Sequence, residues 1–165
     1  MRSIKPEPLT SEAFRQFGEI IGVDQAIPSI EINSGTCQKF AELAYPDCNA
    51  EGGRAAIHIF RAQPARQPII LRTFECHQLG SQTFIPLGEN PFLVAVAPAG
   101  RFEPDAVRVF RVGGQQGIQF HRGTWHHFCL ALDGESDFLV IDRVADEEDC
   151  SEEHLPEKDH FLVAF

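Results

Sequence analysis

The chain has 165 residues, of which 43% are hydrophobic and 10% aromatic, and its formal net charge is −10 at pH 7. This length fits one compact domain with a sizeable core, and this composition excludes an intrinsically disordered chain. No apolar run approaches the ~20 residues that a membrane helix needs, so we expect no membrane partner. The sequence begins MRSIKP, without the apolar segment of a signal peptide.

The cysteines are odd in number and show no C-x-x-C spacing. This usage is typical of reduced thiols in a cytoplasmic protein, and it argues against a disulfide framework or a zinc knuckle. The five positions are Cys37, Cys48, Cys76, Cys129 and Cys150.

The negative charge is concentrated near the end of the chain. Residues 146–159 hold eight acidic groups and one lysine, a net −7, which leaves −3 for the rest of the sequence. We interpret this run as a solvated surface segment. An acidic balance argues against nucleic-acid binding, which needs a basic face, whereas a small anionic ligand is compatible with the nearly neutral remainder.

A short helix is predicted near the start of the chain. Thr10 or Ser11 can cap it, and Phe14 and Phe17 would bury one side before Gly18 ends it.

From there on, the sequence has the period of two that is typical of β-strands. Many short runs punctuated by Gly and Pro predict an all-β sandwich or barrel. We expect one β-barrel domain over residues 1–165, with ligand-binding residues at its mouth. The clearest strand runs are residues 54–61, 69–77, 91–97, 107–112 and 137–144.

The most informative stretch runs from Gly117 to His127 and reads GIQFHRGTWHH. Imidazole titrates near neutral pH and binds metals, so histidines at a strand end and across a turn can do acid–base or metal chemistry. Strand alternation places His126 on one face and Trp125 with His127 on the other, so at most one of the adjacent histidines should face inward. Surface histidines on a hairpin are the alternative.

A second polar set consists of Glu75, His77 and Gln82, with Phe84 following. Glu75 and His77 are two residues apart on a strand and therefore point the same way, and Gln82 arrives on the next strand. This pattern indicates a metal-binding or acid–base set, with a glutamine where a third strong ligand is expected. An exposed pair on an edge strand is the alternative.

Charged residues also occur inside the strand patterns. Asp142 and Arg143 end an apolar strand, where they need a bound carboxylate or a neighbouring histidine, unless they form a structural ion pair with neighbouring loops. Arg61 shares a strand face with Ile57 and Ile59, so we expect its guanidinium to point into the barrel and hold an anion.

In their order along the chain, these motifs resemble the ureidoglycolate lyases (also called ureidoglycolate hydrolases), a family of the cupin superfamily. The resemblance implies a cupin-type, jelly-roll-like β-barrel, a homodimer, that splits ureidoglycolate into glyoxylate and urea in allantoin degradation. The likeness is carried by PLTSEAF at residues 8–14, INSG at 32–35, FRAQPA at 60–65, ECHQLGSQTFIP at 75–86, HRGTWHH at 121–127 and FLVIDR at 138–143.

The resemblance also bears on metal binding. Cupins generally hold a divalent metal with an H-x-H-x(3,4)-E motif and a later histidine, but here Glu75 stands at the first histidine position and Gln82 at the glutamate position. We therefore expect at most a weak metal site at Glu75, His77, Gln82 and His121. The association of the family with nickel implies a stimulating divalent ion that is not strictly required.

Cleavage of ureidoglycolate needs a base for the hydroxyl proton, an acid for the departing urea nitrogen and a cation for the carboxylate. It needs no redox cofactor. We assign the catalytic roles to His77, His121, His126 and Glu75. We assign substrate contacts to Arg61, Gln82, Phe84, Trp125, Asp142 and Arg143.

Two other functional classes stay open at this point. One is a metal-dependent cupin enzyme of another type, a dioxygenase or an isomerase, which would use His77, Gln82, His121 and Glu75. The other is a non-catalytic cupin that binds a small carboxylate. Stoichiometric metal would favour the first class, and glyoxylate binding without turnover would favour the second.

Overall fold

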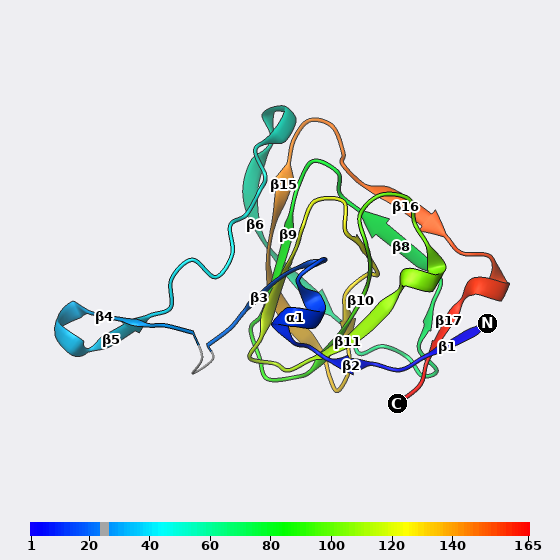
Figure 1. The fold of residues 1–165 in the computed structure, drawn as a ribbon, viewed down its shortest axis with the longest axis horizontal. Helices are drawn as coiled ribbons and strands as arrows, with labels where there is room; N and C mark the ends of the chain where they lie inside the picture. The colour runs from blue at the N-terminus through cyan, green and yellow to red at the C-terminus, as the bar shows by residue number, and fades with distance from the viewer. Residues whose placement is uncertain (24–26) are drawn as a thin grey trace.

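Two β-sheets that face each other make up most of the molecule (Figure 1). The computed structural model describes residues 1–23 and 27–165, whose regular secondary structure is mostly strand, with a single short α-helix. This architecture confirms the all-β fold with a short N-terminal helix that the sequence predicts. The 3-10 turns are η1 (Asn33–Gly35), η2 (Ala50–Gly52), η3 (Pro104–Ala106) and η4 (Glu157–Asp159).

The larger sheet has a central strand that is buried along its whole length. In spatial order its strands are β16 (Ser151–His154), β8 (Thr73–Cys76), β13 (Trp125–His126), β10 (Phe92–Ala97), β11 (Arg108–Val112) and β2 (Glu7–Pro8), with β14 (Leu130–Ala131) also paired to β10. Side chains of β10 alternate between two hydrophobic cores, one on each face of the sheet. This is why the run at residues 91–97 is apolar without interruption.

The facing sheet contains the longest strand pair. Its order is β3 (Gly18–Ile21), β12 (Gly117–Phe120), β9 (Gln82–Pro86), β15 (Ser136–Val144) and β6 (Arg54–Ala62). The nine-residue strands β15 and β6 pair antiparallel over their full length. Because β6 is the edge strand, only β15 holds it to the sheet.

Two small sheets complete the fold. They are β1 (Arg2–Ile4), β17 (Phe161–Val163) and β7 (Ile70–Leu71) in one, and β4 (Ile30–Ile32) with β5 (Cys37–Lys39) in the other. The β4–β5 hairpin projects away from the barrel, whereas the two ends of the chain lie close together (Figure 1). The single strand expected over residues 69–77 is divided at Arg72, because β7 pairs with β17 while β8 joins the larger sheet.

The helix α1 (Ser11–Phe14) begins where the sequence predicts it but ends at Phe14, before the predicted end at Gly18, which is the first residue of β3. Thr10 Oγ1 accepts the backbone N–H of Ala13 at 3.2 Å, and the Phe14 side chain is fully buried. A Cβ on Gly18 would lie 1.7 Å from the Gln119 carbonyl oxygen, so only glycine allows β3 to approach β12 this closely. No helix within residues 1–23 and 27–165 is long and apolar enough to cross a membrane.

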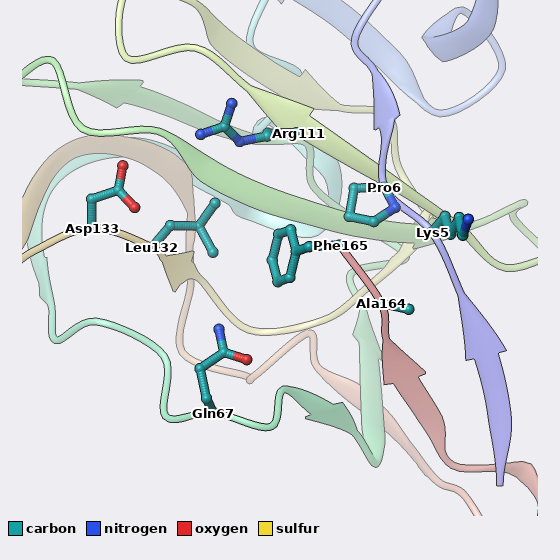
Figure 2. A pocket seen from close by; sticks show the side chains of 8 residues that line it. All are labelled: Lys5, Pro6, Gln67, Arg111, Leu132, Asp133, Ala164 and Phe165. Carbon is teal, nitrogen blue, oxygen red and sulfur yellow. The ribbon is translucent and has the colours of Figure 1, made fainter.

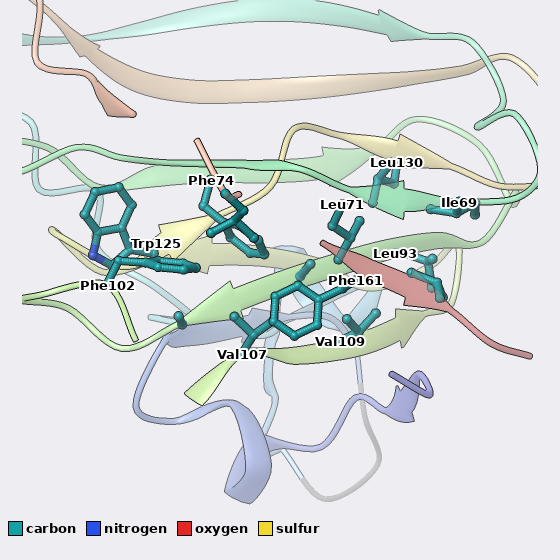
Figure 3. Close-up of a cluster of buried hydrophobic side chains, with 14 of the residues drawn as sticks. Ile69, Leu71, Phe74, Leu93, Phe102, Val107, Val109, Trp125, Leu130 and Phe161 are labelled. Atoms are coloured by element: carbon teal, nitrogen blue, oxygen red, sulfur yellow. The ribbon is translucent and has the colours of Figure 1, made fainter. Parts of the chain in front are cut away.

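The two cores occupy opposite faces of the larger sheet. The inner core lies between the two large sheets and is rich in phenylalanine, with the rings of Phe92 and Phe138 5.1 Å apart. The outer core lies between the larger sheet and the β1–β17–β7 sheet, and includes Phe74, Trp125 and Phe161 (Figure 3). A polar residue on an inward-facing strand position is therefore surrounded by aromatic rings.

Candidate active site

Polar side chains interrupt the inner face of the larger sheet at one end of the barrel. Glu75 lies on β8, His126 lies opposite it on β13, and His77 directly follows β8. One ligand atom from each of the three residues lies within 4.8 Å of the other two. The predicted common direction of Glu75 and His77 is confirmed.

His126 is buried and points inward, as predicted. It is 2% exposed, and its ring stacks on Phe120 of the facing sheet with ring centroids 4.4 Å apart. Its Nδ1 lies 3.0 Å from the backbone carbonyl oxygen of Thr124. Because a carbonyl oxygen only accepts, Nδ1 carries the proton and Nε2 keeps a lone pair. That Nε2 is 3.4 Å from Glu75 Oε1 and makes no hydrogen bond with a described residue.

His77 has the same arrangement. Its Nδ1 lies 2.6 Å from the backbone carbonyl oxygen of Asp149 and therefore carries the proton. Its Nε2 is buried and has no hydrogen-bond partner among the described residues. The rings of His77 and His126 are 5.4 Å apart, so two imidazole lone pairs lie beside the Glu75 carboxylate.

Gln82 contributes a further acceptor. It lies opposite Phe120 in the sheet and shares its inward face, where it is 6% exposed. Its Nε2 donates to Asp142 Oδ2 at 3.4 Å, while its Oε1 is buried without a partner among the residues described. Asp142 in turn lies 3.0 Å from His58 Nε2. Because the Gln82 amide donates to Asp142, its NH₂ group is turned toward that carboxylate, and the amide oxygen is left without a partner among the described residues.

We call Glu75, His77, Gln82 and His126 the acceptor cluster. The buried atoms of this cluster that lack a hydrogen bond within the described chain are acceptors: His77 Nε2, His126 Nε2 and Gln82 Oε1. A buried acceptor without a partner costs about 1–3 kcal/mol of desolvation. The cluster therefore suits a cation, or a ligand that presents several N–H and O–H donors.

Charge reinforces this preference. Burial raises the pKa of the Glu75 carboxyl, but a hydrogen bond from His126 and the positive charges of His126, His77 and His127, which act when these imidazoles are protonated, lower it more, so that the pKa lies below its ordinary value. Glu75 is thus an anion at neutral pH. His127 points away from the cluster, with its ring 5.9 Å from that of Phe74, and burial lowers its pKa.

The cluster also fits a divalent metal. Two imidazole nitrogens and one carboxylate are ligands that Ni²⁺, Zn²⁺ and Fe²⁺ accept, and each imidazole has its Nδ1–H on a backbone carbonyl, as ligating histidines do. The sequence predicts His121 as one of the metal ligands, and this residue has to be replaced. The structure brings His126, and not His121, together with Glu75 and His77.

A cavity of about 510 Å³ opens beside the cluster, and His77, Asp142 and Arg143 line it. Arg143 donates from Nε to the Ala50 carbonyl oxygen at 3.0 Å and from Nη2 to that of Glu51 at 3.3 Å. The alternative Asp142–Arg143 ion pair is not formed, since Asp142 pairs with His58. The acidic segment also contributes to the lining, at Glu147, Glu148, Asp149, Cys150 and Glu152.

The expected inward position of Arg61 is wrong. Its side chain is 62% exposed and binds Asp137 through two parallel hydrogen bonds of 2.7 Å each. Ile57 and Ile59 on the same strand face are 71% and 58% exposed. The inward face of β6 is the one that carries His58, which the sequence pattern does not single out because the isoleucines indicate the opposite face.

Two aromatic residues expected to contact substrate belong to the hydrophobic cores instead. Trp125 lies on the opposite face of β13 from His126, packs on Phe102, and donates from Nε1 to the Gly100 carbonyl oxygen at 2.9 Å (Figure 3). Phe84 is 7% exposed within the inner core. The alternation that turns His126 inward necessarily turns Trp125 outward.

His121 does not join His77 and His126, and this expectation is also wrong. It directly follows Phe120, which faces inward, so His121 points to the other side of the sheet. Its Nε2 lies 2.6 Å from Glu19 Oε1, and it lines a separate cavity of about 540 Å³ that includes Tyr45.

A third cavity, also of about 540 Å³, lies between the two ends of the chain (Figure 2). Lys5, Arg111, Asp133 and Phe165 are among the side chains around it. Within the described chain, its lining includes no histidine or cysteine and none of the residues singled out by the sequence. We therefore assign the candidate active site to the acceptor cluster and the cavity beside it.

A buried histidine–carboxylate cluster therefore lies at one end of this all-β fold. The model of the family described as ureidoglycolate lyase matches residues 1–162. The chain belongs to the ureidoglycolate lyase family.

Relatives from several bacteria match the chain along almost its whole length. The ureidoglycolate lyase of Burkholderia mallei (strain NCTC 10229) is 43% identical over 157 residues, which cover 95% of this chain and 92% of the relative. That of Pseudomonas entomophila (strain L48) is 42% identical over 164 residues, which cover 99% and 98%.

Similar solved structures are more distant. RmlC from Streptococcus suis has a TM-score of 0.48 and 12% identity, covering 73% of this chain and 63% of that one. The dTDP-4-dehydrorhamnose 3,5-epimerase from Elizabethkingia anophelis has a TM-score of 0.45 and 13% identity, covering 88% and 92%.

The donor set can be tested with Ni²⁺. We expect His126→Ala to weaken Ni²⁺ binding at least ~10-fold in isothermal titration calorimetry, because it removes one of the imidazole ligands. His121→Ala is the matched control and should leave the affinity unchanged. Equal losses in both variants would contradict the corrected ligand set.

Proposed function

We propose that this protein is a ureidoglycolate lyase that splits ureidoglycolate into glyoxylate and urea. Its family membership supports this reaction over a dioxygenase, an isomerase or a non-catalytic sensor. The observation that carries the proposal is the acceptor cluster beside a cavity that Arg143 lines.

The substrate complements this arrangement. One carbon of ureidoglycolate bears a hydroxyl, a carboxylate and the ureido nitrogen. The hydroxyl and ureido groups present O–H and N–H donors, which suit His77 Nε2, His126 Nε2 and Gln82 Oε1. The carboxylate needs a cation, and we assign it to the Arg143 guanidinium.

Carbon–nitrogen cleavage then requires the transfer of one proton. The Nε2 atom of His77 or His126 takes the hydroxyl proton as the carbonyl group of glyoxylate forms. The electron pair of the breaking C–N bond goes to nitrogen, and the imidazolium returns the proton to that nitrogen as urea leaves. Glu75 stabilises the imidazolium through its negative charge. Such acid–base catalysis typically contributes ~10²–10⁴-fold, and no redox change occurs.

A divalent ion, nickel before others, is proposed as a stimulating cofactor held by Glu75, His77 and His126. Such an ion would lower the pKa of the substrate hydroxyl, and an imidazole that gives up the ion when the substrate binds would still be available to take the proton. Because the chain's own groups suffice for the proton transfer, we propose that the ion is not strictly required.

We also propose where the enzyme is located and in which pathway it acts. All five cysteines are free thiols, which supports a cytoplasmic location. We propose a role in allantoin and purine degradation, with no nucleic-acid or membrane partner.

We also propose that the protein is a homodimer that uses the outer face of β6. Ile57 and Ile59 expose apolar side chains there, and they pair with the half-buried Ile141 and Leu139 of β15. Contiguous exposed apolar side chains of this kind mark protein interfaces, and a two-fold axis would cover both copies of the face at once.

The reaction is tested with purified protein and ureidoglycolate, following urea, glyoxylate and ammonia together. We expect equal amounts of urea and glyoxylate and no ammonia. His77→Ala and His126→Ala should each lower kcat/KM at least ~10²-fold, about 2.7 kcal/mol of transition-state stabilisation.

His121→Ala is the control for these variants, because His121 lines a different cavity, and its kcat/KM should stay close to that of the wild type. Ammonia release would contradict the lyase reaction. A damaging His121→Ala with a silent His126→Ala would show that the catalytic residues lie in the other cavity.

The carboxylate contact is tested by a pair of arginine variants. Arg143→Lys keeps the charge but loses the planar fork, so KM for ureidoglycolate and the inhibition constant for glyoxylate should both rise, by roughly 10-fold. Arg61→Lys should change neither constant, because Arg61 binds Asp137 on the outer face. If Arg61→Lys raised both constants and Arg143→Lys changed neither, Arg61 would be the residue that binds the substrate carboxylate.

The interface is tested by the double variant Ile57→Lys/Ile59→Lys. Two buried charges on each copy of a symmetric interface should convert the dimer to a monomer in light scattering coupled to size-exclusion chromatography. Phe128→Lys, which changes an exposed aromatic residue outside β6, should remain dimeric. A monomeric wild-type protein would contradict the proposal.

A further inference from the structure

The acidic run at residues 146–159 is not uniformly a solvated segment, contrary to the interpretation of its sequence. Asp146, Glu147 and Glu148 are exposed, but Asp149 is half-buried and hydrogen-bonded. Asp159 forms an ion pair with Arg2 at 2.9 Å. Asp149 is the member of this run that reaches the acceptor cluster.

Strand pairing explains how Asp149 arrives there. β16 runs antiparallel to β8 at the edge of the larger sheet, with Ser151 opposite Cys76. Continuing this register beyond the strand places residues 150 and 149 level with His77 and Gln78. Asp149 is 71 residues from Gln78 in sequence and its contact depends on this pairing.

Asp149 accepts three hydrogen bonds from the turn after β8. Its carboxylate accepts the backbone N–H of Gln78 at 2.9 Å and that of Leu79 at 2.5 Å. Its backbone carbonyl oxygen accepts the Nδ1–H of His77 at 2.6 Å. Hydrogen bonds from backbone N–H groups to a carboxylate are charge-assisted and strong. The side chain of Asp149 therefore fixes the distance between the Asp149 backbone carbonyl oxygen and the His77 imidazole.

The other imidazole of the cluster is held differently. His126 donates to the carbonyl of Thr124, two residues away in the same turn. The position of the His77 ring therefore depends on a distant segment, whereas that of His126 depends on its own turn. A change at Asp149 should therefore displace the His77 ring and leave the His126 ring in place.

We propose that Asp149 is a positioning residue for His77. By clamping the turn at residues 77–79, it keeps its carbonyl on His77 Nδ1–H and so keeps the Nε2 lone pair directed at Glu75 and His126. Which imidazole nitrogen carries the proton is set by the hydrogen bond of the other nitrogen. The effect of this positioning on catalysis rests on the proposed function of the acceptor cluster.

The test compares Asp149→Ala with Asp146→Asn, an exposed member of the same acidic run that does not line the cavity. Two-bond ¹H–¹⁵N correlation spectra identify the protonated nitrogen of each histidine. We expect Asp149→Ala to lose the single Nδ1–H form of His77 while His126 keeps its form. The kcat should fall at least ~10-fold with a smaller change in KM, since a misplaced proton on a catalytic histidine impairs the chemical step. Asp146→Asn should match the wild type in both measurements.

A folded Asp149→Ala protein in which His77 keeps the Nδ1–H form would overturn the positioning role. A changed His77 form with unchanged kcat would retain the positioning role but contradict the catalytic role of His77 in the proposed function. If Asp149→Ala does not fold, Asp149→Asn decides, because its amide oxygen can still accept one of the two backbone N–H groups. It should show an intermediate loss of the Nδ1–H form, and an unchanged spectrum would overturn the proposal.

Discussion

The pairing of β13 with β8 is the contact on which the candidate site depends. It sets His126 opposite Glu75, and the next inward-facing position after Glu75 is His77. A shift of one residue in this pairing would turn Trp125 inward and move His126 to the outer core. The two hydrophobic cores resist such a shift, because each matches one face of the same strands.

Burial of the acceptor cluster costs free energy of folding, and contacts with the surrounding aromatic rings offset this cost. Three buried acceptors without partners in the described chain, at about 1–3 kcal/mol each, oppose folding. The inner core offsets this cost with rings that contact the cluster directly, as Phe120 does by stacking on His126. A bound ligand with donors would therefore stabilise the protein as well as react, since it restores the missing hydrogen bonds.

Sequence periodicity predicts relative orientation well and absolute orientation poorly. It correctly separated His126 from His127 and grouped Glu75 with His77, because those relations depend only on alternation. It failed at Arg61, because the apolar Ile57 and Ile59 face outward on an edge strand and local pattern does not reveal which face is covered. Contacts between distant segments, such as that of Asp149 with His77, have no local signal, since they follow from a strand pairing that the sequence does not display.

The charge around the cavity narrows the ligands that the site can accept. Among the described residues that line it, Arg143 is the one permanent cation, and Glu147, Glu148 and Glu152 line the same cavity. A dianion would gain one attractive contact and meet several repulsive ones, at distances where charges near a protein surface still interact strongly. A small monoanion can place its carboxylate at Arg143 and direct its donors toward the acceptor cluster. Urea is neutral, so after cleavage the Arg143 charge does not hold it.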